Sequence, residues 1–367
     1  MKYNWQQKDW PTFTYNLETL EDKLFLFTEK VGRLSGILQG LSEEEQTQNF
    51  IDMMVVEAIK TSEIEGEYLS RQDVMSSIKN NLGLNKPFEP VKDKRAKGIA
   101  ELMLYIRDNY AAVLKEENLH TLHTMLMKGN SRINVGTWRS GSEPMQVISG
   151  SIGKEIIHYE APPSAIVDTE MKRFISWFNK TMPTEKKDLK QASIRAAVVH
   201  VYFESIHPYE DGNGRIGRAL SEKALYQGLG LPIPISLSRV IEANKQAYYQ
   251  ALMEAQRSNE ITPWIDYFVT TLLSAQEDAE RQIHFVLQKT QFFDRFAHQF
   301  NERQEKVIRR MFNEGPNGFE GGMNAKKYQS IAKTSKATAT RDLQQLVLLG
   351  AFVAYGGGRS TRYTLSL

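Results

Sequence analysis

Apolar residues recur every three or four positions along most of this chain, which is the spacing of amphipathic helices. Between residues 17 and 40 they form a single apolar face, which consists of Leu20, Leu24, Phe27, Val31, Leu34 and Leu38. The same spacing predicts helices over residues 47–62, 93–109, 116–126, 164–181, 188–206, 215–227, 239–258 and 262–300. The pattern therefore predicts an all-α protein, and it is interrupted at two places.

The first interruption, residues 135–163, is rich in glycine, serine and proline. Two β-prone runs flank a glycine-containing turn between Val147 and Tyr159, a pattern typical of a β-hairpin. A hairpin inside a helical protein is expected to lie on the surface as a flap, and such loops often carry function. Trp138 and Arg139 precede it, and the sequence leaves open whether they position it.

The second interruption is the linker-like segment Gly315–Gly322, after which the pattern changes. Two short helices are predicted near Tyr328 and from Ala337, followed by strands over 352–355 and 363–365, which is the order of a winged helix. Residues 323–367 contain seven basic residues and one acidic residue, a balance of +6. Both DNA binding and a role confined to packing or assembly remain compatible with this segment.

Composition narrows the class of protein. Apolar residues make up 41% and charged residues 25% of the 367 positions, as in folded proteins of two or three domains. The net charge of +2 does not mark the whole chain as a partner of polyanions. The absence of cysteine excludes disulfides and thiol catalysis. Since we find neither a signal-peptide pattern nor an apolar run of about 20 residues, we expect no membrane partner and a cytoplasmic location.

The candidate chemistry lies in the loop from His207 to Arg218, which reads His-Pro-Tyr-Glu-Asp-Gly-Asn-Gly-Arg-Ile-Gly-Arg. Its glycines allow backbone N–H groups to approach a ligand closely, and the start of the helix that follows favours anions. Arg215 and Arg218 lie one helical turn apart, so both side chains can point at one phosphate chain. The loop is therefore predicted to bind a phosphate-containing ligand.

Two further residues complete this prediction. Asp211 lies beside the anion site and would repel phosphate unless a divalent cation bridged them, which implies Mg²⁺. His207 ends an apolar helix, and its imidazole is suited to take a proton from an attacking hydroxyl. We therefore predict a phosphoryl- or nucleotidyl-transfer site. The alternative, a helix-capping turn with solvated arginines, accounts for each residue alone but not for the run. His120 and His123 are predicted to pack rather than to bind zinc.

The run resembles the signature of Fic-domain proteins (filamentation induced by cAMP), whose best-known members transfer AMP from ATP to other proteins. Every signature position matches except Tyr209, where phenylalanine is usual; the ring is kept, so we expect it to anchor the loop in the core. The wider resemblance extends over about residues 89–267. It implies an all-helical Fic-type bundle with a β-hairpin flap over the active site, matched here by residues 147–159.

By position, the resemblance implies that His207 is the general base and that Asp211 holds Mg²⁺. It implies that the backbone around three residues, Gly212, Asn213 and Gly214, forms the anion hole for the α- and β-phosphates of ATP. Arg215 would bind the β-phosphate and Arg218 the γ-phosphate. The flap would hold an extended segment of a target protein by main-chain pairing.

The segment Asn244–Tyr249 resembles the stretch near the adenine site of the family. Asn244, Tyr248 and Tyr249 are therefore candidate ATP contacts. For the two tyrosines, packing in the core at helical spacing is an equally good interpretation.

Residues 61–66, Thr-Ser-Glu-Ile-Glu-Gly, resemble the inhibitory motif Ser/Thr-x-x-x-Glu-Gly/Asn of the family. The motif, with Thr61, Glu65 and Gly66 at its defined positions, precedes the core, as in members with an N-terminal inhibitory helix. Glu65 can form a bidentate salt bridge with Arg218 and so occupy the group that the γ-phosphate requires. The alternative is a solvated glutamate at a glutamate-rich helix end.

These expectations define four segments: an N-terminal helical region with the inhibitory motif (1–88), a Fic core (89–270), a connecting helix (271–314) and a winged-helix domain (323–367). The leading prediction is a protein adenylyltransferase that modifies a Ser, Thr or Tyr hydroxyl of a target or of itself and is autoinhibited by Glu65. The alternatives are removal of AMP, transfer of another phosphate-containing group, and a nucleotide-sensing DNA-binding regulator. A homodimer is compatible with the sequence, which does not identify the target.

Overall fold

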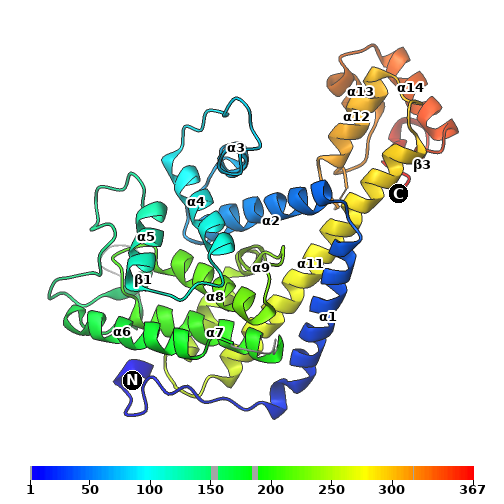
Figure 1. Ribbon diagram of the computed structural model, residues 1–367. Coiled ribbons are helices and arrows are strands. Elements are labelled where there is room, and N and C mark those ends of the chain that lie inside the picture. Colours follow the sequence, from blue (N-terminus) through cyan, green and yellow to red (C-terminus); the bar gives the residue numbers. More distant parts are fainter. Residues whose placement is uncertain (1, 150–155, 184–188, 317) are drawn as a thin grey trace. The chain divides into compact units, whose positions relative to one another are not determined.

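The computed structural model describes residues 2–149, 156–183, 189–316 and 318–367 (Figure 1). They form two compact units, one of residues up to 39 and 46–277, the other of residues 40–45 and 278–367. The fold is mostly helical with two small β-hairpins, as the sequence predicted. None of the helices in the described residues is long and apolar enough to cross a membrane.

The helices of the first unit follow the predicted order. They are α1 (Glu21–Gln39), α2 (Glu43–Ile64), α3 (Arg71–Asn81), α4 (Lys94–Asp108), α5 (Glu116–Leu126), α6 (Ser164–Lys180), α7 (Leu189–Ile206), α8 (Asn213–Leu229), α9 (Leu237–Ala243), α10 (Lys245–Ala255) and the first part of α11 (Thr262–Arg295). Short 3₁₀ turns at Asn4–Gln6 and Glu18–Leu20 precede them. Asp188, where the helix before the loop was predicted to start, lies outside the described residues.

Two predicted helices need correction, and one helix was not predicted. The single helix expected over residues 239–258 is two helices, because the chain leaves helical geometry at Asn244, whose side chain accepts a hydrogen bond from the N–H of Ala247. The helix expected to reach residue 300 ends at Arg295, and a separate helix, α12 (Glu302–Phe312), follows. Helix α3 was not predicted at all.

Helices α7 and α8 form the centre of the first unit and make its most extensive helix pair (Figure 1). From Ala192 to Ile206 every residue of α7 is buried, as expected for a helix that is apolar on all sides. Near the C-terminal end of α8, Gly228 lies against Ala192 so closely that a Cβ atom at residue 228 would overlap the Ala192 side chain. This close contact fixes the distance between the two helices that flank the candidate loop.

The first hairpin pairs β1 (Gln146–Ser149) with β2 (Ile156–Glu160) in antiparallel register, with Val147 opposite Tyr159. The predicted turn of the flap, residues 150–155, lies outside the described residues. Buried Tyr159 donates a hydrogen bond of 2.6 Å to the carbonyl oxygen of Ser205 in α7. The indole N–H of Trp5 donates to the carbonyl of Glu160 at 2.8 Å. The base of the flap is thus tied to the helix that leads into the loop.

The second unit contains α12, α13 (Ala325–Ala332), α14 (Lys336–Leu348), β3 (Phe352–Tyr355) and β4 (Arg362–Leu365). An isolated bridge pairs Met323 with Tyr363 beside the β3–β4 hairpin. This succession confirms the predicted winged-helix order. Its core combines apolar residues from each element, among them Val307, Ile308, Tyr328, Leu343, Leu346 and Phe352.

Replacing Gly228 by alanine tests the α7–α8 contact. Alanine in an exposed helix normally stabilises by up to about 1 kcal/mol relative to glycine. At residue 228 we expect the opposite, a loss of about 1–3 kcal/mol, because the added methyl group overlaps Ala192. Gly32→Ala in α1 is the matched control, since a Cβ atom there meets nothing within 4 Å. Urea unfolding measures both variants, and a stabilised Gly228→Ala protein would contradict the contact.

Candidate active site

The loop between α7 and α8 is held in an uncommon backbone conformation at both ends. His207 has a φ of +51° while its N–H still donates to the carbonyl of Phe203 at 2.9 Å, so it closes the last turn of α7. Gly212, with a φ of +83°, caps the start of α8. The backbone angle favours glycine, and a side chain at residue 212 would also displace the terminal methyl group of Met127.

The middle of the loop is closed by Asn213. Its side chain accepts a hydrogen bond from the N–H of Tyr209 at 2.9 Å and donates one to the carbonyl of the same residue at 2.8 Å. The ring of Tyr209 is fully buried and stacks on His123 with 3.9 Å between the ring centroids. The predicted anchoring of this ring is confirmed. Because both polar groups of the Asn213 side chain are engaged in the loop, the residue sets the shape of the loop.

His123 joins the loop to the segment before the flap. Its Nδ1 accepts a hydrogen bond from the N–H of Gly136 at 2.8 Å, so Nε2 carries the proton and donates to the carbonyl of Asp211 at 3.2 Å. Burial lowers the pKa of His123 to about 4, although the nearby Asp211 opposes that shift. A neutral imidazole is therefore part of the folded site.

The imidazole of His207 lies next to Glu204, a buried residue that the sequence analysis did not assign. Nδ1 of His207 is 3.6 Å from a carboxylate oxygen of Glu204, one turn earlier in α7. Burial alone would raise the pKa of Glu204, but the neighbouring His207, His200 and Arg218 lower it by more. The signal was present in the sequence as a lone glutamate within the apolar run Val201–Ile206. Glu204 places a negative charge beside Nδ1, at a distance longer than a hydrogen bond, and Nε2 is the other nitrogen of the His207 ring.

Arg139, which the sequence left undecided, connects the flap to the loop. Its Nε donates to the carbonyl of His207 at 2.8 Å, and one terminal nitrogen donates to the hydroxyl of Ser164 at 2.9 Å. The other terminal nitrogen donates to the carbonyl of Pro162, just after β2. Burial lowers the pKa of Arg139 to about 10, so the group remains charged at neutral pH. The guanidinium group thus fixes the position of the flap relative to the His207 backbone.

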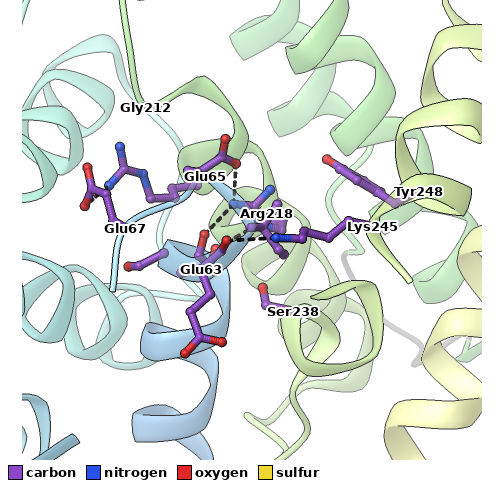
Figure 2. A network of polar contacts seen from close by, with 12 residues as sticks. Glu63, Glu65, Glu67, Gly212, Arg218, Ser238, Lys245 and Tyr248 are labelled. Carbon is purple, nitrogen blue, oxygen red and sulfur yellow. Dashed lines mark hydrogen bonds and ion pairs between the residues drawn. The ribbon is translucent and has the colours of Figure 1, made fainter. Parts of the chain in front are cut away.

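Arg218 is the most constrained charge of the site, with a side chain that is 3% exposed (Figure 2). Its Nε donates to the hydroxyl of Thr61 at 2.8 Å, and one terminal nitrogen, Nη2, lies 2.7 Å from a carboxylate oxygen of Glu65. The second terminal nitrogen, Nη1, has no partner among the described residues. Burial alone would lower the pKa of Arg218, but the Glu65 carboxylate raises it above its ordinary value. The predicted ion pair between Glu65 and Arg218 is present, but it is not bidentate as expected: one guanidinium nitrogen meets one carboxylate oxygen, because Thr61 accepts the hydrogen bond from Nε.

The geometry of the 61–66 motif explains its residue types. Thr61 and Glu65 are one turn apart, so both side chains reach the same guanidinium group. Gly66 has a φ of +79° and turns the chain away after α2. A side chain at Gly214 would overlap the Glu65 carboxylate and lie 3.1 Å from Arg218, so the glycine at the start of α8 makes room for the glutamate.

Arg215 is also engaged by a glutamate, which the sequence analysis did not assign. Its side chain is 3% exposed, and one terminal nitrogen lies 2.8 Å from a carboxylate oxygen of Glu67. The other terminal nitrogen is 3.7 Å from Asp211. In Figure 2 Glu63, Glu65 and Glu67 lie together at the C-terminal end of α2, with Arg218 beside them. Glu67 and Glu65 thus each hold one of the two loop arginines.

The three residues predicted near adenine occupy different environments. Tyr248 is buried, and its hydroxyl is 2.8 Å from Nε2 of His200. Tyr249 is 43% exposed and donates to the carbonyl of Ile64 at 3.3 Å. Asn244 caps α10 with its side chain. Lys245, also on α10, donates to the carbonyl of Glu63 at 3.3 Å (Figure 2). Helix α10 therefore packs against the end of α2, where the motif lies.

The carboxylate of Asp211 is the candidate metal ligand. It is 49% exposed, and one oxygen accepts a hydrogen bond from the N–H of Gly212 at 2.6 Å. No group of three or more histidines and carboxylates that could hold a metal occurs in the described part of the chain. A single exposed carboxylate suits Mg²⁺, which usually binds to one or two carboxylates and completes its shell with water and substrate phosphates.

Comparison with known families agrees with this geometry. Residues 113–225, which include the loop, match the model of the Fic/DOC family, and residues 3–84 match a domain of unknown function, DUF4172. The chain therefore contains a Fic/DOC-family domain preceded by a DUF4172 domain.

Two curated relatives each match this chain over about a quarter of its length. The chain is 31% identical over 100 residues to a probable protein adenylyltransferase of Aquifex aeolicus, and 33% identical over 92 residues to a Fido domain-containing protein of Dictyostelium discoideum. These matches span 27% and 25% of this chain, and 27% and 59% of the respective relatives. The similarity is distant and concerns part of each protein.

Solved structures share the fold. A Fic family protein from Desulfovibrio desulfuricans aligns with a TM-score of 0.57 at 19% identity, covering 97% of this chain and 98% of that chain. A Fic domain-containing signalling protein from Bacteroides thetaiotaomicron aligns with a TM-score of 0.53 at 19% identity, covering 69% and 95%. At this identity the likeness establishes a Fic-like fold.

The depressed pKa of His123 predicts a dependence of stability on pH. The folded state favours neutral His123, so its contribution is complete above the ordinary value of 6.5 and is lost as the pH falls towards about 4. We expect His123→Gln to be less stable at pH 7.5 but to lose less stability between pH 7.5 and 5.0, by on the order of 1 kcal/mol. Urea unfolding at both pH values measures this.

Burial also lowers the pKa of His200 to about 4, so the His123→Gln protein should keep part of the dependence of stability on pH. A control histidine that is not buried is therefore needed. His284, exposed on α11, provides it. If His284→Gln reduced the pH dependence of stability as much as His123→Gln does, the buried His123 would not be the source of that dependence.

Proposed function

We propose that this protein is an adenylyltransferase that moves AMP from ATP to a hydroxyl group of a protein. The observation that carries the proposal is the pair of buried arginines, Arg215 and Arg218, at the glycine-rich start of α8. Each now faces a glutamate carboxylate, so each occupies a site that accepts an anionic oxygen. The similarity to a probable protein adenylyltransferase supports ATP, rather than another phosphate donor, as the ligand.

In the proposed reaction the target hydroxyl oxygen attacks the α-phosphorus of ATP. A new oxygen–phosphorus bond forms, the bond from the α-phosphorus to the α–β bridging oxygen breaks, and pyrophosphate leaves with that electron pair. Nε2 of His207 accepts the hydroxyl proton, while Glu204 at Nδ1 stabilises the charged ring. The backbone N–H groups of Asn213 and Gly214, at the start of α8, would face the phosphates, as helix N-termini do, whereas that of Gly212 is bonded to the Asp211 carboxylate.

Asp211 is the residue that would hold Mg²⁺. A bound Mg²⁺ would neutralise phosphate charge next to this carboxylate. Arg215 and Arg218 would hold the β- and γ-phosphates and so fix the leaving pyrophosphate. Tyr249 and Asn244 remain the candidates for the adenine end, whereas buried Tyr248 supports α10 from within through His200.

The flap is the proposed docking site of the target. On β2 the carbonyls of His158 and Glu160 already accept hydrogen bonds from Arg257 and Trp5. We therefore assign the edge of β1, residues Gln146–Ser149, to main-chain pairing with an extended target segment. Pairing through the main chain presents a target hydroxyl to His207 with little demand on the sequence around it.

We also propose that the protein is autoinhibited by the ion pairs of Glu65 with Arg218 and of Glu67 with Arg215. Removing one partner from a buried ion pair costs about 3–5 kcal/mol, so Arg218 exchanges Glu65 only for another anion. The γ-phosphate of ATP must compete with Glu65 at Arg218, and the β-phosphate with Glu67 at Arg215. The two glutamates thus oppose the productive placement of the same triphosphate.

Releasing Arg218 should activate transfer. We expect Glu65→Gly to raise incorporation of AMP into the purified protein or a target at least about tenfold, since one tenfold step corresponds to only about 1.4 kcal/mol. The measurement uses ATP labelled at the α-phosphate, with intact mass to distinguish AMP from phosphate. His207→Ala in the same background should abolish the signal.

Glu63→Gly is the matched control, because Glu63 pairs with Lys60 and leaves both loop arginines untouched. Equal labelling of Glu65→Gly and wild type would refute autoinhibition by Glu65. Persistent labelling in the Glu65→Gly, His207→Ala double variant would refute the assigned base.

Glu67 should act on ATP binding through Arg215. In the Glu65→Gly background, we expect Glu67→Gln to lower the apparent KM for ATP about three- to tenfold, the range expected for a partly exposed ion pair worth about 1 kcal/mol. Glu63→Gln in that background should leave KM unchanged. A Glu67→Gln variant with the same KM but lower stability would give Glu67 a purely structural role.

A further inference from the structure

The C-terminal module, residues 323–367, carries a charged surface that the proposed transfer reaction does not use. We propose that this module binds double-stranded DNA, with α14 in the major groove and the tip of the β3–β4 hairpin on the phosphate backbone.

The fold of the module presents one face of α14 to solvent. Helix α13 ends at Ala332 and is followed by Lys333, which has a φ of +51°. Helix α14 begins after Ser335, whose hydroxyl accepts a hydrogen bond from the N–H of Thr338. The inner face of α14 is buried through three residues, Ala339, Leu343 and Leu346. The outer face consists of Lys336, Ala337, Thr340, Arg341 and Gln344, of which all but the half-buried Thr340 are exposed.

The residue types of this outer face suit a DNA groove. Arg341 and Gln344 carry the donors and acceptors that read base edges. Ala337 and Thr340 are small, so the helix axis can approach the groove closely. Lys336 lies at the N-terminal turn, which is the end of a recognition helix that contacts DNA in helix-turn-helix proteins.

The exposed charged side chains of the module are all basic, because its one acidic residue, Asp342, is buried. Asp342 accepts hydrogen bonds from Arg303 of α12 at 3.0 Å and from the hydroxyl of Tyr328 at 2.9 Å. Within the described residues, no ion pair involves Lys326, Lys333, Lys336 or Arg341. Exposed and unneutralised cations are what the phosphates of a duplex bind.

Two acidic residues of the neighbouring segment are already paired with arginines. On α12 Glu305 pairs with Arg309, and beyond its end Glu314 pairs with Arg310. The hairpin adds a tip of three glycines, Gly356–Gly358, all exposed, with half-buried Arg362 at the start of β4. A glycine tip allows the backbone to approach a phosphate, as a winged-helix wing requires.

The same module has exposed apolar residues that fit a different role. Leu348 is 87% exposed at the end of α14, and Val353 and Tyr355 on β3 are about half exposed. These residues lie beyond the charged turns of α14. Self-association through them is the competing outcome of the test below.

The test measures binding of the full chain to a labelled DNA duplex of about 30 base pairs and random sequence, by fluorescence anisotropy at 50 and 200 mM salt. With four or five cations engaged, log K should fall with log salt with a slope of about −4. A duplex RNA of equal length should bind at least about tenfold more weakly, because its deep, narrow major groove does not admit a helix. No ATP is present, so the outcome is independent of the transferase proposal.

The decisive variant is Lys336→Glu with Arg341→Glu, for which we expect at least about a tenfold loss of DNA affinity. The matched control, Lys8→Glu with Lys172→Glu, changes two exposed lysines of the first unit and the same net charge, and should retain binding. Thermal melting verifies that both variants are folded. No binding at 50 mM salt, an equal loss in the control, or equal affinity for duplex RNA would overturn the proposal. If the protein does not bind DNA but forms a dimer that Leu348→Ser dissociates, the exposed surface of the module serves self-association and the proposal is overturned.

Discussion

The site is organised around a guanidinium group that is almost completely removed from water. Arg218 is 3% exposed in the core of the helical bundle, and a charge in that position requires an anion nearby. Glu65 supplies the anion in this structure, together with the carbonyl and hydroxyl oxygens of Thr61. The same requirement makes the group a strong receptor for phosphate. One buried cation with two competing anions thus accounts for both the proposed activity and its proposed inhibition.

The surrounding fold keeps that cation in place. Because α7 and α8 pack at contact distance through Gly228, the loop between them has little freedom. Asn213 closes the loop from within, His123 holds the carbonyl of Asp211, and Arg139 holds the carbonyl of His207. None of these side chains contacts the proposed phosphates. They position the backbone that does, which is why the signature requires residues that touch only the protein itself.

Much of this was predictable from sequence, for identifiable reasons. Helices with a sustained apolar period were found, whereas α3 was missed because only Val74, Ser76, Ser77 and Ile78 are buried along it. The break at Asn244 was missed because the apolar spacing continues through it, so the pattern does not show that one helix ends there and another begins. The Glu65–Arg218 pair was predictable because a motif encodes it. Glu67 and Arg139 act through contacts between segments far apart in the chain, which no local pattern shows. Glu204 did have a local signal, a lone glutamate within an apolar run, and was overlooked.

The position of Glu65 relative to its helix has a mechanical consequence. Helix α2 ends at Ile64, and the next two N–H groups bond to carbonyls only three residues back. Thr61, by contrast, lies inside the helix. Helix ends open locally at far lower cost than helix interiors. Thr61 therefore holds the arginine from within the helix and Glu65 from beyond its end, so loss of the Glu65 contact alone would leave the guanidinium oriented by Thr61.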